Sequence, residues 1–329
     1  MKTDQTTIDF IYAPVHAQLA QVEDRFTDLA SRSDALLQEL LAHITKIPGK
    51  RVRPAITLLC AGLFPHKEDV NDIVVTMGAA VELLHMASLV HDDMVDNASV
   101  RRGQATVSSV WGDNVAVMLG DYIFAASAVF VCDTKNVRVI RRFSETIMEL
   151  STGQIMESFG AFKWDRAIDE YKDRIYNKTA SLFRTAAESG AILGGAPEPQ
   201  VQWLTQYGRS LGMAFQIVDD VLDFEGTEEE IGKPVGHDLL EGTLTLPSML
   251  LVQRYPDDNP VIKLFEGNDP ETNRLAALDM IRNSTVLEES LKVAEEYCEE
   301  ARSILGQLAD TRERQSLMEL VSYVTDRRR

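Results

Sequence analysis

The feature that most constrains the fold is a long apolar stretch that ends in a cluster of acids. Residues 83–91 read Leu-Leu-His-Met-Ala-Ser-Leu-Val-His, and Asp92, Asp93 and Asp96 follow directly. On a helix of 3.6 residues per turn, Asp92 and Asp96 share one face, and Asp93 lies about one turn from Asp96. Like charges at i and i+4 destabilise a helix by roughly 0.2–0.5 kcal/mol. The cluster is therefore either a solvated helix end or a site for a hard divalent cation, which prefers carboxylate oxygens.

The same spacing occurs a second time, far along the chain. Asp219, Asp220 and Asp223 follow another apolar run, residues 211–218. Two acidic triplets that each end an apolar helix are difficult to explain as surface decoration. The repetition therefore favours metal binding over a solvated helix end.

Almost every other segment shows a helical rather than an alternating pattern of apolar residues. We expect helices over residues 36–44, 54–63, 71–94, 114–132, 137–159 with an interruption at Gly153, 171–193, 200–222 and 287–308. Residues 97–103 read as a polar, basic loop, and residues 224–246 as a loop rich in Gly, Pro and charge. No strand pair is expected. The pattern predicts an all-α protein with one domain over residues 1–329.

Composition restricts the partners and the compartment. The 329 residues carry a formal net charge of -18, which argues against nucleic acid or an anionic membrane surface as the main partner. The three cysteines form no Cys-x-x-Cys pair, and the N-terminus has no apolar signal segment, so we expect a cytoplasmic protein. Residues 115–132 are long enough to cross a bilayer. Because Asp121 and several small residues interrupt them, we interpret them as a buried core helix, with no integral membrane segment.

Two short basic segments complement the acids. Residues 48–54 read Pro-Gly-Lys-Arg-Val-Arg-Pro, and Arg101-Arg102-Gly103 follows the first triplet. The first segment is not a P-loop, because Ile44 stands where the earlier Gly is needed and Arg51 follows the Lys. Alone, either segment could be a solvated turn. Together with two acidic triplets, they suggest a diphosphate held by bridging magnesium ions and by direct cations.

Other kinds of site fit the spacing less well. An EF-hand has ligands at alternate positions around a central Gly, whereas these acids have helical spacing. A kinase or dinucleotide-binding protein needs a Gly-rich loop after a strand, and neither is present in the pattern. A glycosidase needs two carboxylates but neither two triplets nor basic partners. A non-catalytic helical scaffold leaves the repeated triplets unexplained.

Six motifs in order resemble those of the trans-polyprenyl diphosphate synthases, across nearly the whole chain. They are Lys50-Arg51-Val52-Arg53-Pro54, Glu82 through Asp96 with Arg101-Arg102-Gly103, Asn177-Lys178-Thr179-Ala180, Gln216 through Asp223, Gly232-Lys233-Pro234, and Asp238-Leu239. The resemblance implies an antiparallel helical bundle around a deep central cavity, the isoprenoid synthase fold, as a homodimer. It also implies a prenyltransferase that extends an allylic diphosphate with isopentenyl diphosphate.

The resemblance also implies a role for each site residue. Magnesium ions that grip the allylic diphosphate would be bound by the two triplets, with Asp92, Asp96 and Asp219 as the firmest contacts and Asp93, Asp220 and Asp223 completing the set. Isopentenyl diphosphate would be held by Lys50, Arg53, His85 and Arg102. The allylic diphosphate would be held by Arg101, Lys178 and Lys233, with Thr179 and Gln216 along the forming cation. Of these, Asp92, Asp93, Asp96, Lys178, Thr179, Gln216 and Asp219 are the predicted catalytic residues.

The resemblance also bears on the length of the product, and the chain departs from the family pattern at one position. Ala87 and Ser88 precede the first triplet, where a bulky aromatic residue would limit the product, so the resemblance favours about thirty carbons or more. Many members have Gly-Lys where this chain has Gly242-Thr243, so a second late lysine is missing.

The alternatives to a long-chain synthase are an enzyme with a twenty-carbon geranylgeranyl product and a non-catalytic partner subunit. A terpene cyclase would not need Lys50, Arg53 and Arg102.

Overall fold

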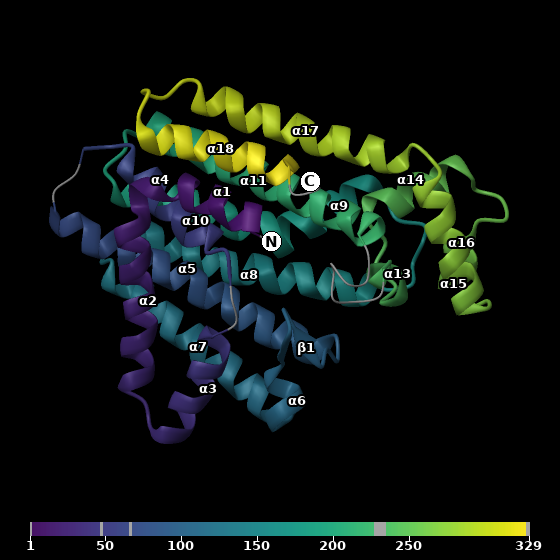
Figure 1. Cartoon of the computed structure of the whole chain (residues 1–329), viewed down its shortest axis with the longest axis horizontal. Coiled ribbons are helices and arrows are strands. Elements are labelled where there is room, and N and C mark those ends of the chain that lie inside the picture. The colour runs from purple at the N-terminus through teal and green to yellow at the C-terminus, as the bar shows by residue number, and fades with distance from the viewer. Residues whose placement is uncertain (1, 47–48, 66–67, 227–234, 327–329) are drawn as a thin grey trace. The chain divides into compact units, whose positions relative to one another are not determined.

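The computed structural model describes residues 2–46, 49–65, 68–226 and 235–326, and these residues are overwhelmingly helical, as predicted (Figure 1). The first half of the chain forms α1 (Lys2–Ile11), the short 3-10 helix η1 (Ala13–Val15), α2 (His16–Ser31), α3 (Ala35–Thr45), α4 (Val52–Gly62), α5 (Glu68–Val95), α6 (Val107–Trp111), α7 (Asp113–Asp133) and α8 (Val137–Gly160). The second half forms α9 (Ile168–Ile175), the π-helical turn η2 (Tyr176–Ala180), α10 (Ser181–Leu193), α11 (Glu198–Glu225), α13 (His237–Leu240), α14 (Leu246–Arg254), α15 (Pro260–Phe265), α16 (Pro270–Arg282), α17 (Val286–Leu305) and α18 (Arg312–Asp326).

The chain divides into two compact units, each built from separate segments. Unit 1 comprises Met1–Ile147, Leu182–Gly208 and Ser303–Leu320, and unit 2 comprises Met148–Ser181, Arg209–Arg302 and Val321–Arg329. The first acidic triplet and both basic segments belong to unit 1, and the second triplet belongs to unit 2. That the whole chain is one domain stays a prediction.

Helix α5 forms the centre of unit 1. It packs against α2, α4 and α7 (Figure 1). Its residues 77–84 are all buried, among them Met77, Leu83 and Leu84. Removing this apolar surface from water contributes roughly 1.5–3 kcal/mol for each large side chain. The predicted helix over residues 71–94 is thus confirmed, and it places the first triplet at the end of a rigid core element.

Helix α7 differs from the prediction of a buried core helix. Ile123 and its neighbours on one face are buried, but an apolar stripe on the other face is exposed, with Val117, Met118 and Val129 exposed by 37%, 63% and 59%. By length and composition, α7 and Val70–Val95 of α5 both qualify as membrane spans, and 33% and 72% of their apolar windows are buried. The interruption of the pattern by Asp121 therefore marked the outer face of the helix rather than a core position.

A small hairpin follows α5, although no strand pair was expected. Strand β1 (Val100–Arg101) pairs antiparallel with β2 (Gln104–Ala105). Arg102 and Gly103, at the turn, have φ of 50° and 78°. Positive φ at both central residues is typical of the two-residue turns that join twisted strands. Strands of two residues are too short to show an alternating pattern, which is why the sequence did not reveal them.

Unit 2 contains two departures from the expected helices. Helix α8 is continuous through Gly153, where an interruption was predicted, and a Cβ at Gly153 would lie 2.6 Å from the backbone nitrogen of Lys178. Gly153 thus allows the close approach of two backbones instead of breaking a helix. The predicted helix over residues 171–193 contains the π-helical turn η2, which separates α9 from α10. Such turns often occur at functional sites, and this one holds Lys178 and Thr179.

The end of unit 2 follows the prediction more closely. Helix α11 extends the expected segment of residues 200–222 by two or three residues at each end. The expected loop of residues 224–246 contains the short helix α13, and residues 227–234 lie outside the described part. In the C-terminal region the helical pattern of residues 287–308 corresponds to α17, which ends at Leu305. The fold is therefore all-α, as the sequence indicated.

Candidate active site

The first acidic triplet combines one buried acid with two half-exposed ones. Asp93 is 5% exposed and accepts a hydrogen bond of 2.6 Å from Nε of Arg101. Asp92 and Asp96 are partly exposed. The β1–β2 hairpin turns the chain back over α5 and so brings Arg101 to Asp93. The ion pair fixes the helix end while Asp92 and Asp96 stay accessible.

The basic segment before α4 is anchored through Arg51. This residue precedes α4 with a φ of 49°. Its Nε donates to Glu23 at 2.6 Å, and its Nη1 donates to the buried Glu82 at 3.0 Å. Glu82 lies one turn before His85 on α5, so Arg51 ties the basic segment to the helix that carries the triplet. Of its neighbours, Arg53 places its guanidinium 4.7 Å from the ring centroid of Phe183.

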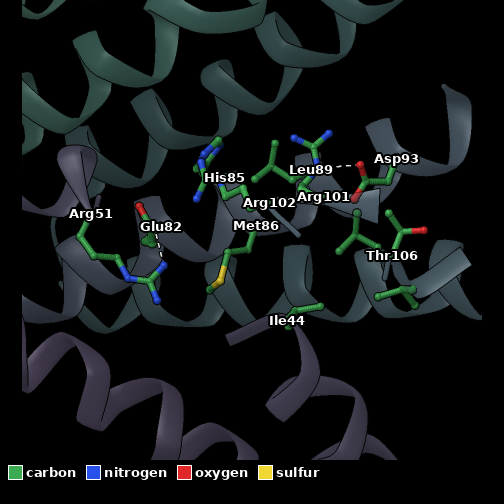
Figure 2. A pocket seen from close by; sticks show the side chains of 12 residues that line it. Ile44, Arg51, Glu82, His85, Met86, Leu89, Asp93, Arg101, Arg102 and Thr106 are labelled. Atoms are coloured by element: carbon green, nitrogen blue, oxygen red, sulfur yellow. Dashed lines mark hydrogen bonds and ion pairs between the residues drawn. The ribbon is translucent and has the colours of Figure 1, made fainter. Parts of the chain in front are cut away.

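A pocket in unit 1 connects these groups (Figure 2). Arg51 with Glu82 lies at one end, Arg101 with Asp93 at the other, and His85 and Arg102 lie between them. Its lining residues are Ile44, Arg51, Glu82, His85, Met86, Leu89, Val90, Asp93, Arg101, Arg102, Thr106 and Val107. Three arginines in one pocket of a strongly acidic protein form a site suited to an anion.

The predicted residues of unit 1 are only partly gathered in this pocket. His85, Arg101, Arg102 and Asp93 line it, whereas Lys50 and Arg53 do not belong to its lining. A Cβ at Gly49 would lie 3.0 Å from Nη1 of Arg51 and 3.2 Å from Nη1 of Arg102. Arg102, at the turn of the hairpin, therefore lies beside the segment that carries Lys50.

His85 is neutral in this surrounding. Burial lowers the pKa of its imidazole well below the usual range, and Arg53, Arg102 and the two other arginines nearby lower it further. A neutral imidazole offers one N–H donor to an anionic ligand without adding a charge. His85 can therefore act as a hydrogen-bond donor beside the cations.

The second triplet has the same pattern of burial but different partners. Asp220 is 4% exposed, and its two oxygens accept hydrogen bonds of 2.7 Å from the hydroxyl of Tyr171 and from Nε2 of Gln216. Burial raises the pKa of Asp220 to about 6, although Arg174 and both hydrogen bonds act against the shift. Asp219 and Asp223 are partly exposed.

Acids accumulate around the second triplet. The carboxylate of Asp223 accepts hydrogen bonds of 3.2 Å from the backbone nitrogens of His237 and Asp238, at the start of α13. Burial, followed by the charges of Asp223, Asp220 and Glu157, raises the pKa of Asp238 well above the usual range. An excess of carboxylates in one place favours the binding of cations.

The π-helical turn places two predicted residues in a polar network. The hydroxyl of Thr179 donates to Oε1 of Gln216 at 2.5 Å. Nζ of Lys178 forms an ion pair with Glu157, and Nη1 of Arg174 donates to the other oxygen of Glu157 at 3.0 Å. Lys178, Thr179, Gln216 and Asp220 are thus brought together in unit 2, whereas Lys233 lies outside the described residues.

Several residues to which the resemblance assigned no role belong to these groups. Arg51 and Glu82 anchor the basic segment, and Glu157, Tyr171 and Arg174 contact the residues around η2. Glu82 carried a signal, since a charged residue three positions before His85 interrupts an apolar run. Tyr171 carried none, because its partner Asp220 lies 49 residues further along the chain.

The carboxylates of the two triplets suit a hard divalent cation, but they supply only part of its ligands. Carboxylate oxygens are the ligands that magnesium prefers, and half-exposed acids occur in both triplets. Within the described part of the chain, no group of three or more His, Cys, Asp or Glu side chains is arranged to hold a metal ion. Magnesium is commonly bound through one or two carboxylates together with substrate phosphates. The acids therefore fit an ion that is completed by a diphosphate.

Comparison with known proteins identifies the family. The family model described as Polyprenyl synthetase matches residues 34–281. A prenyl transferase from Synechocystis is 35% identical over 318 residues, covering 96% of this chain and 98% of the relative. The chain belongs to the polyprenyl synthetase family and is a trans-prenyltransferase.

Two further relatives carry more specific names. Heptaprenyl diphosphate synthase component 2 from Geobacillus stearothermophilus is 35% identical over 321 residues, covering 96% of this chain and 98% of the relative. Nonaprenyl diphosphate synthase from Mycobacterium tuberculosis is 33% identical over 317 residues, covering 96% and 94%. This chain is similar to both over nearly its full length.

Solved structures agree with the fold. A decaprenyl diphosphate synthase from Rhodobacter capsulatus superposes with a TM-score of 0.90 at 34% identity, covering 98% of this chain and 99% of that one. A polyprenyl synthase from Caulobacter crescentus, complexed with calcium and isoprenyl diphosphate, gives 0.91 at 30% identity, covering 98% of both. A geranylgeranyl pyrophosphate synthetase from Pyrococcus horikoshii gives 0.85 at 28% identity, covering 96% and 98%. The chain thus has the isoprenoid synthase fold.

Proposed function

We propose that this protein condenses isopentenyl diphosphate head to tail with an allylic diphosphate. The product is a polyprenyl diphosphate of about thirty carbons or longer, and its new double bonds are trans. The observation that carries the proposal is the repeated triplet, in which the second acid is buried and the first and third stay half exposed. The names of the heptaprenyl, nonaprenyl and decaprenyl relatives support the long product. Their similarity along almost the whole chain also supports a single synthase domain over residues 1–329.

The site residues keep the roles that the resemblance implies. We propose magnesium as the metal, with Asp92, Asp96 and Asp219 as its principal ligands. When bound, magnesium would neutralise charge on the diphosphate oxygens and so help the diphosphate to leave the allylic substrate. The cations near each triplet hold the diphosphates and offset the charge that builds up on the leaving group, which is usually the largest catalytic contribution.

In unit 1, we propose that the pocket between Arg51 and Arg101 receives isopentenyl diphosphate. Arg102 and the neutral His85 lie between these two arginines, where they can donate to phosphate oxygens. Lys50 and Arg53, on the adjacent segment, add positive charge. In unit 2, Lys178 holds the allylic diphosphate, and Thr179 and Gln216 lie along its prenyl chain.

The small residues before the first triplet support a long product. Ala87 is fully buried, and the hydroxyl of Ser88 donates to the carbonyl of His85 at 2.8 Å, so neither adds bulk. We expect Ser88→Phe to shorten the product, because an aromatic ring would occupy space that the growing chain needs. An unchanged product length would remove Ser88 from the product cavity.

The deciding experiment incubates purified protein with magnesium, isopentenyl diphosphate and farnesyl diphosphate, followed by chromatography of the products. A ladder that ends at thirty carbons or more supports the proposal. A single twenty-carbon product would select the geranylgeranyl alternative, and no extension by the chain alone would contradict the proposal as stated.

A second candidate is one subunit of a two-chain synthase. It is favoured by the relative named component 2, a name that describes a part of a larger enzyme. In that case the purified chain would be inactive and would gain activity when its partner chain is added. The set of site residues argues for a catalytic rather than a supporting role, because both acidic triplets are intact.

We further propose a cytoplasmic homodimer in which a second copy covers the exposed stripe of α7. Val117, Met118 and Val129 would be buried there, and removing such apolar surface from water favours association. Met118→Asp should halve the mass measured by light scattering without unfolding the protein. A wild-type chain that is monomeric in the same measurement would contradict the proposal.

A further inference from the structure

Two largely buried side chains on one face of α9 contact the acids around the π-helical turn. Tyr171 and Arg174 are one turn apart, and the Arg174 guanidinium lies 5.6 Å from the centroid of the Tyr171 ring. Tyr171 is 3% exposed, and the side chain of Arg174 is 11% exposed. Neither residue was among the predicted site residues. Their contacts lead in two directions, to Thr179 and to Lys178.

The first arm runs from Tyr171 to Thr179. The Tyr171 hydroxyl donates to one oxygen of Asp220, and Nε2 of Gln216 donates to the other, both at 2.7 Å. Oε1 of Gln216 accepts from the hydroxyl of Thr179 at 2.5 Å. The four side chains therefore form one continuous chain of hydrogen bonds.

The chemistry of this arm fixes the direction of the Gln216 amide. An ionised carboxylate only accepts hydrogen bonds, so the amide NH₂ of Gln216 must point toward Asp220. Its carbonyl oxygen then points toward Thr179, whose hydroxyl is the donor. Because the Tyr171 hydroxyl occupies the second oxygen of Asp220, the carboxylate is held in place from both sides.

The second arm runs from Arg174 to Lys178. Nη1 of Arg174 donates to one oxygen of Glu157 at 3.0 Å, and the other oxygen forms an ion pair with Lys178. Nη2 of Arg174 donates to the carbonyl of Leu244 at 2.8 Å, beside Thr243. Burial alone would raise the pKa of Glu157, but Lys178 and Arg174 hold it below its usual range. Glu157 is therefore a carboxylate shared between two cations.

The backbone between the arms is tightly confined. The turn η2 (Tyr176–Ala180) follows α9 directly, and α8 passes so close that a Cβ at Gly153 would lie 2.6 Å from the nitrogen of Lys178. The backbone of Lys178 and Thr179 is thus fixed by packing. The directions of their side chains depend on the partners at their ends.

We propose that Tyr171 and Arg174 are positioning residues that aim Thr179 and Lys178 at the allylic substrate, one through Asp220 and Gln216 and the other through Glu157. The inference rests on the proposed function. The arm from Tyr171 orients groups along the prenyl chain, where the cation forms. The arm from Arg174 orients an ammonium toward the diphosphate.

The two arms predict different kinetic effects. Tyr171→Phe removes one hydroxyl and should lower kcat about tenfold with little change in the KM of the allylic diphosphate, because the loss is felt in the transition state. Arg174→Met should raise that KM about tenfold and leave the KM of isopentenyl diphosphate unchanged. Arg174→Lys keeps the charge beside Glu157 and should recover part of the loss.

A binding measurement separates positioning from turnover. Each protein is titrated calorimetrically with inorganic diphosphate in the presence of magnesium. Diphosphate should bind more weakly to Arg174→Met than to the wild type and equally well to Tyr171→Phe. Tyr207→Phe is the matched control, because Tyr207 is fully buried and its hydroxyl donates to the carbonyl of Leu317 at 3.2 Å, within unit 1. Arg302→Met is the control for the arginine, whose contacts with Glu295 and Glu299 lie within α17.

The outcomes distinguish this inference from the function on which it rests. If the wild-type protein extends no substrate, the proposed function fails and the inference fails with it. If the wild type is active and both variants match it, the inference alone is overturned. It is also overturned if kcat and both KM values change only together with the melting temperature, as expected of the control Tyr207→Phe. Separate effects on kcat and on the allylic KM at unchanged melting temperature support it.

Discussion

The two acidic triplets have the same spacing and the same pattern of burial, yet they are held by different chemistry. In each, the second acid is buried, with Asp93 and Asp220 exposed by 5% and 4%, and the outer acids are partly exposed. Asp93 is paired with a cation, Arg101, whereas Asp220 accepts hydrogen bonds from two neutral donors, Tyr171 and Gln216. Helical periodicity decides which acid turns inward, but the surrounding elements decide how its charge is balanced.

The third acids differ as well. Asp223 accepts hydrogen bonds from two backbone nitrogens at the start of α13, whereas Asp96, directly after α5, caps no helix start among the residues that the structure describes. The first triplet is therefore the more open of the two, with its counter-charge supplied by a hairpin. The second is built into a network of neutral donors and backbone groups. This difference gives each triplet its own response to mutation and pH.

The largest expected effect belongs to the first acid of each triplet. Asp92→Ala and Asp219→Ala should each lower kcat by about 100-fold or more, because each removes a proposed magnesium ligand that has no substitute. Circular dichroism should show an unchanged fold. Asp169→Ala, at a side chain that is 93% exposed, is the control. Near-normal turnover in one variant alone would show that the triplets are not equivalent in metal binding.

The second acids should differ in stability. Asp93→Asn removes the carboxylate from a largely buried ion pair and should lower the free energy of unfolding by about 2–3 kcal/mol, reduced from the fully buried case because Arg101 is partly exposed. Asp220→Asn keeps an acceptor for the Tyr171 hydroxyl and also removes a buried negative charge, so it should change the free energy of unfolding by less than about 1 kcal/mol. Urea titrations at pH 8 measure both. Equal losses would mean that the charge of the partner is unimportant.

Much of this arrangement was predictable from the sequence. The apolar runs before each triplet predicted α5 and α11, and the resemblance predicted that Lys178, Thr179 and Gln216 lie near one another. Burial of the second acids follows from the same periodicity, because Asp93 and Asp220 continue the apolar faces of their helices. The fold class and the family could thus be obtained before any coordinates, and the site residues of unit 2 stay predictions.

The rest depends on contacts that leave no local signal. The residues of the π-helical turn have no composition that distinguishes them from an α-helix. The hydrogen bond of Tyr171 to Asp220 joins residues far apart in the chain. The exposed stripe of α7 was mistaken for core, because an apolar residue looks the same in sequence whether it faces a neighbouring helix or the surface. Arg51 was passed over in favour of Lys50 and Arg53, since only the fold brings Glu23 and Glu82 to its two ends.

A third prediction uses pH, which acts with opposite sign on the two regions. Burial and the nearby arginines lower the pKa of His85, so below about 6.5 the unfolded chain binds a proton that the folded chain does not. Stability therefore rises with pH up to about 6.5. His85→Asn should flatten this rise in urea titrations between pH 5 and 7. A rise as steep as in the wild type would mean that His85 titrates normally.

Asp220 should act in the reverse direction in the absence of metal. Burial raises its pKa to about 6, so between about 4 and 6 the folded chain keeps a proton that the unfolded chain has released. Stability falls as pH rises through this window, by about 1–2 kcal/mol. Asp220→Asn should remove this fall in urea titrations with EDTA, whereas Asp93→Asn should not. The same slope in Asp220→Asn and wild type would place the titration elsewhere.

The smallest effect distinguishes the third acids, and it tests whether capping and metal binding have been divided between them. Asp223→Asn should lower the free energy of unfolding by about 1 kcal/mol, because the carboxylate that caps α13 becomes a weaker acceptor. Asp96→Asn should change it by less than about 0.5 kcal/mol. The requirement for magnesium should respond in the opposite order, with the larger increase in Asp96→Asn, since Asp96 is a principal ligand in the proposal and Asp223 is not. If Asp223→Asn raised the magnesium requirement as much and left stability unchanged, its hydrogen bonds to α13 would be incidental, and the two triplets would bind metal with the same pair of acids.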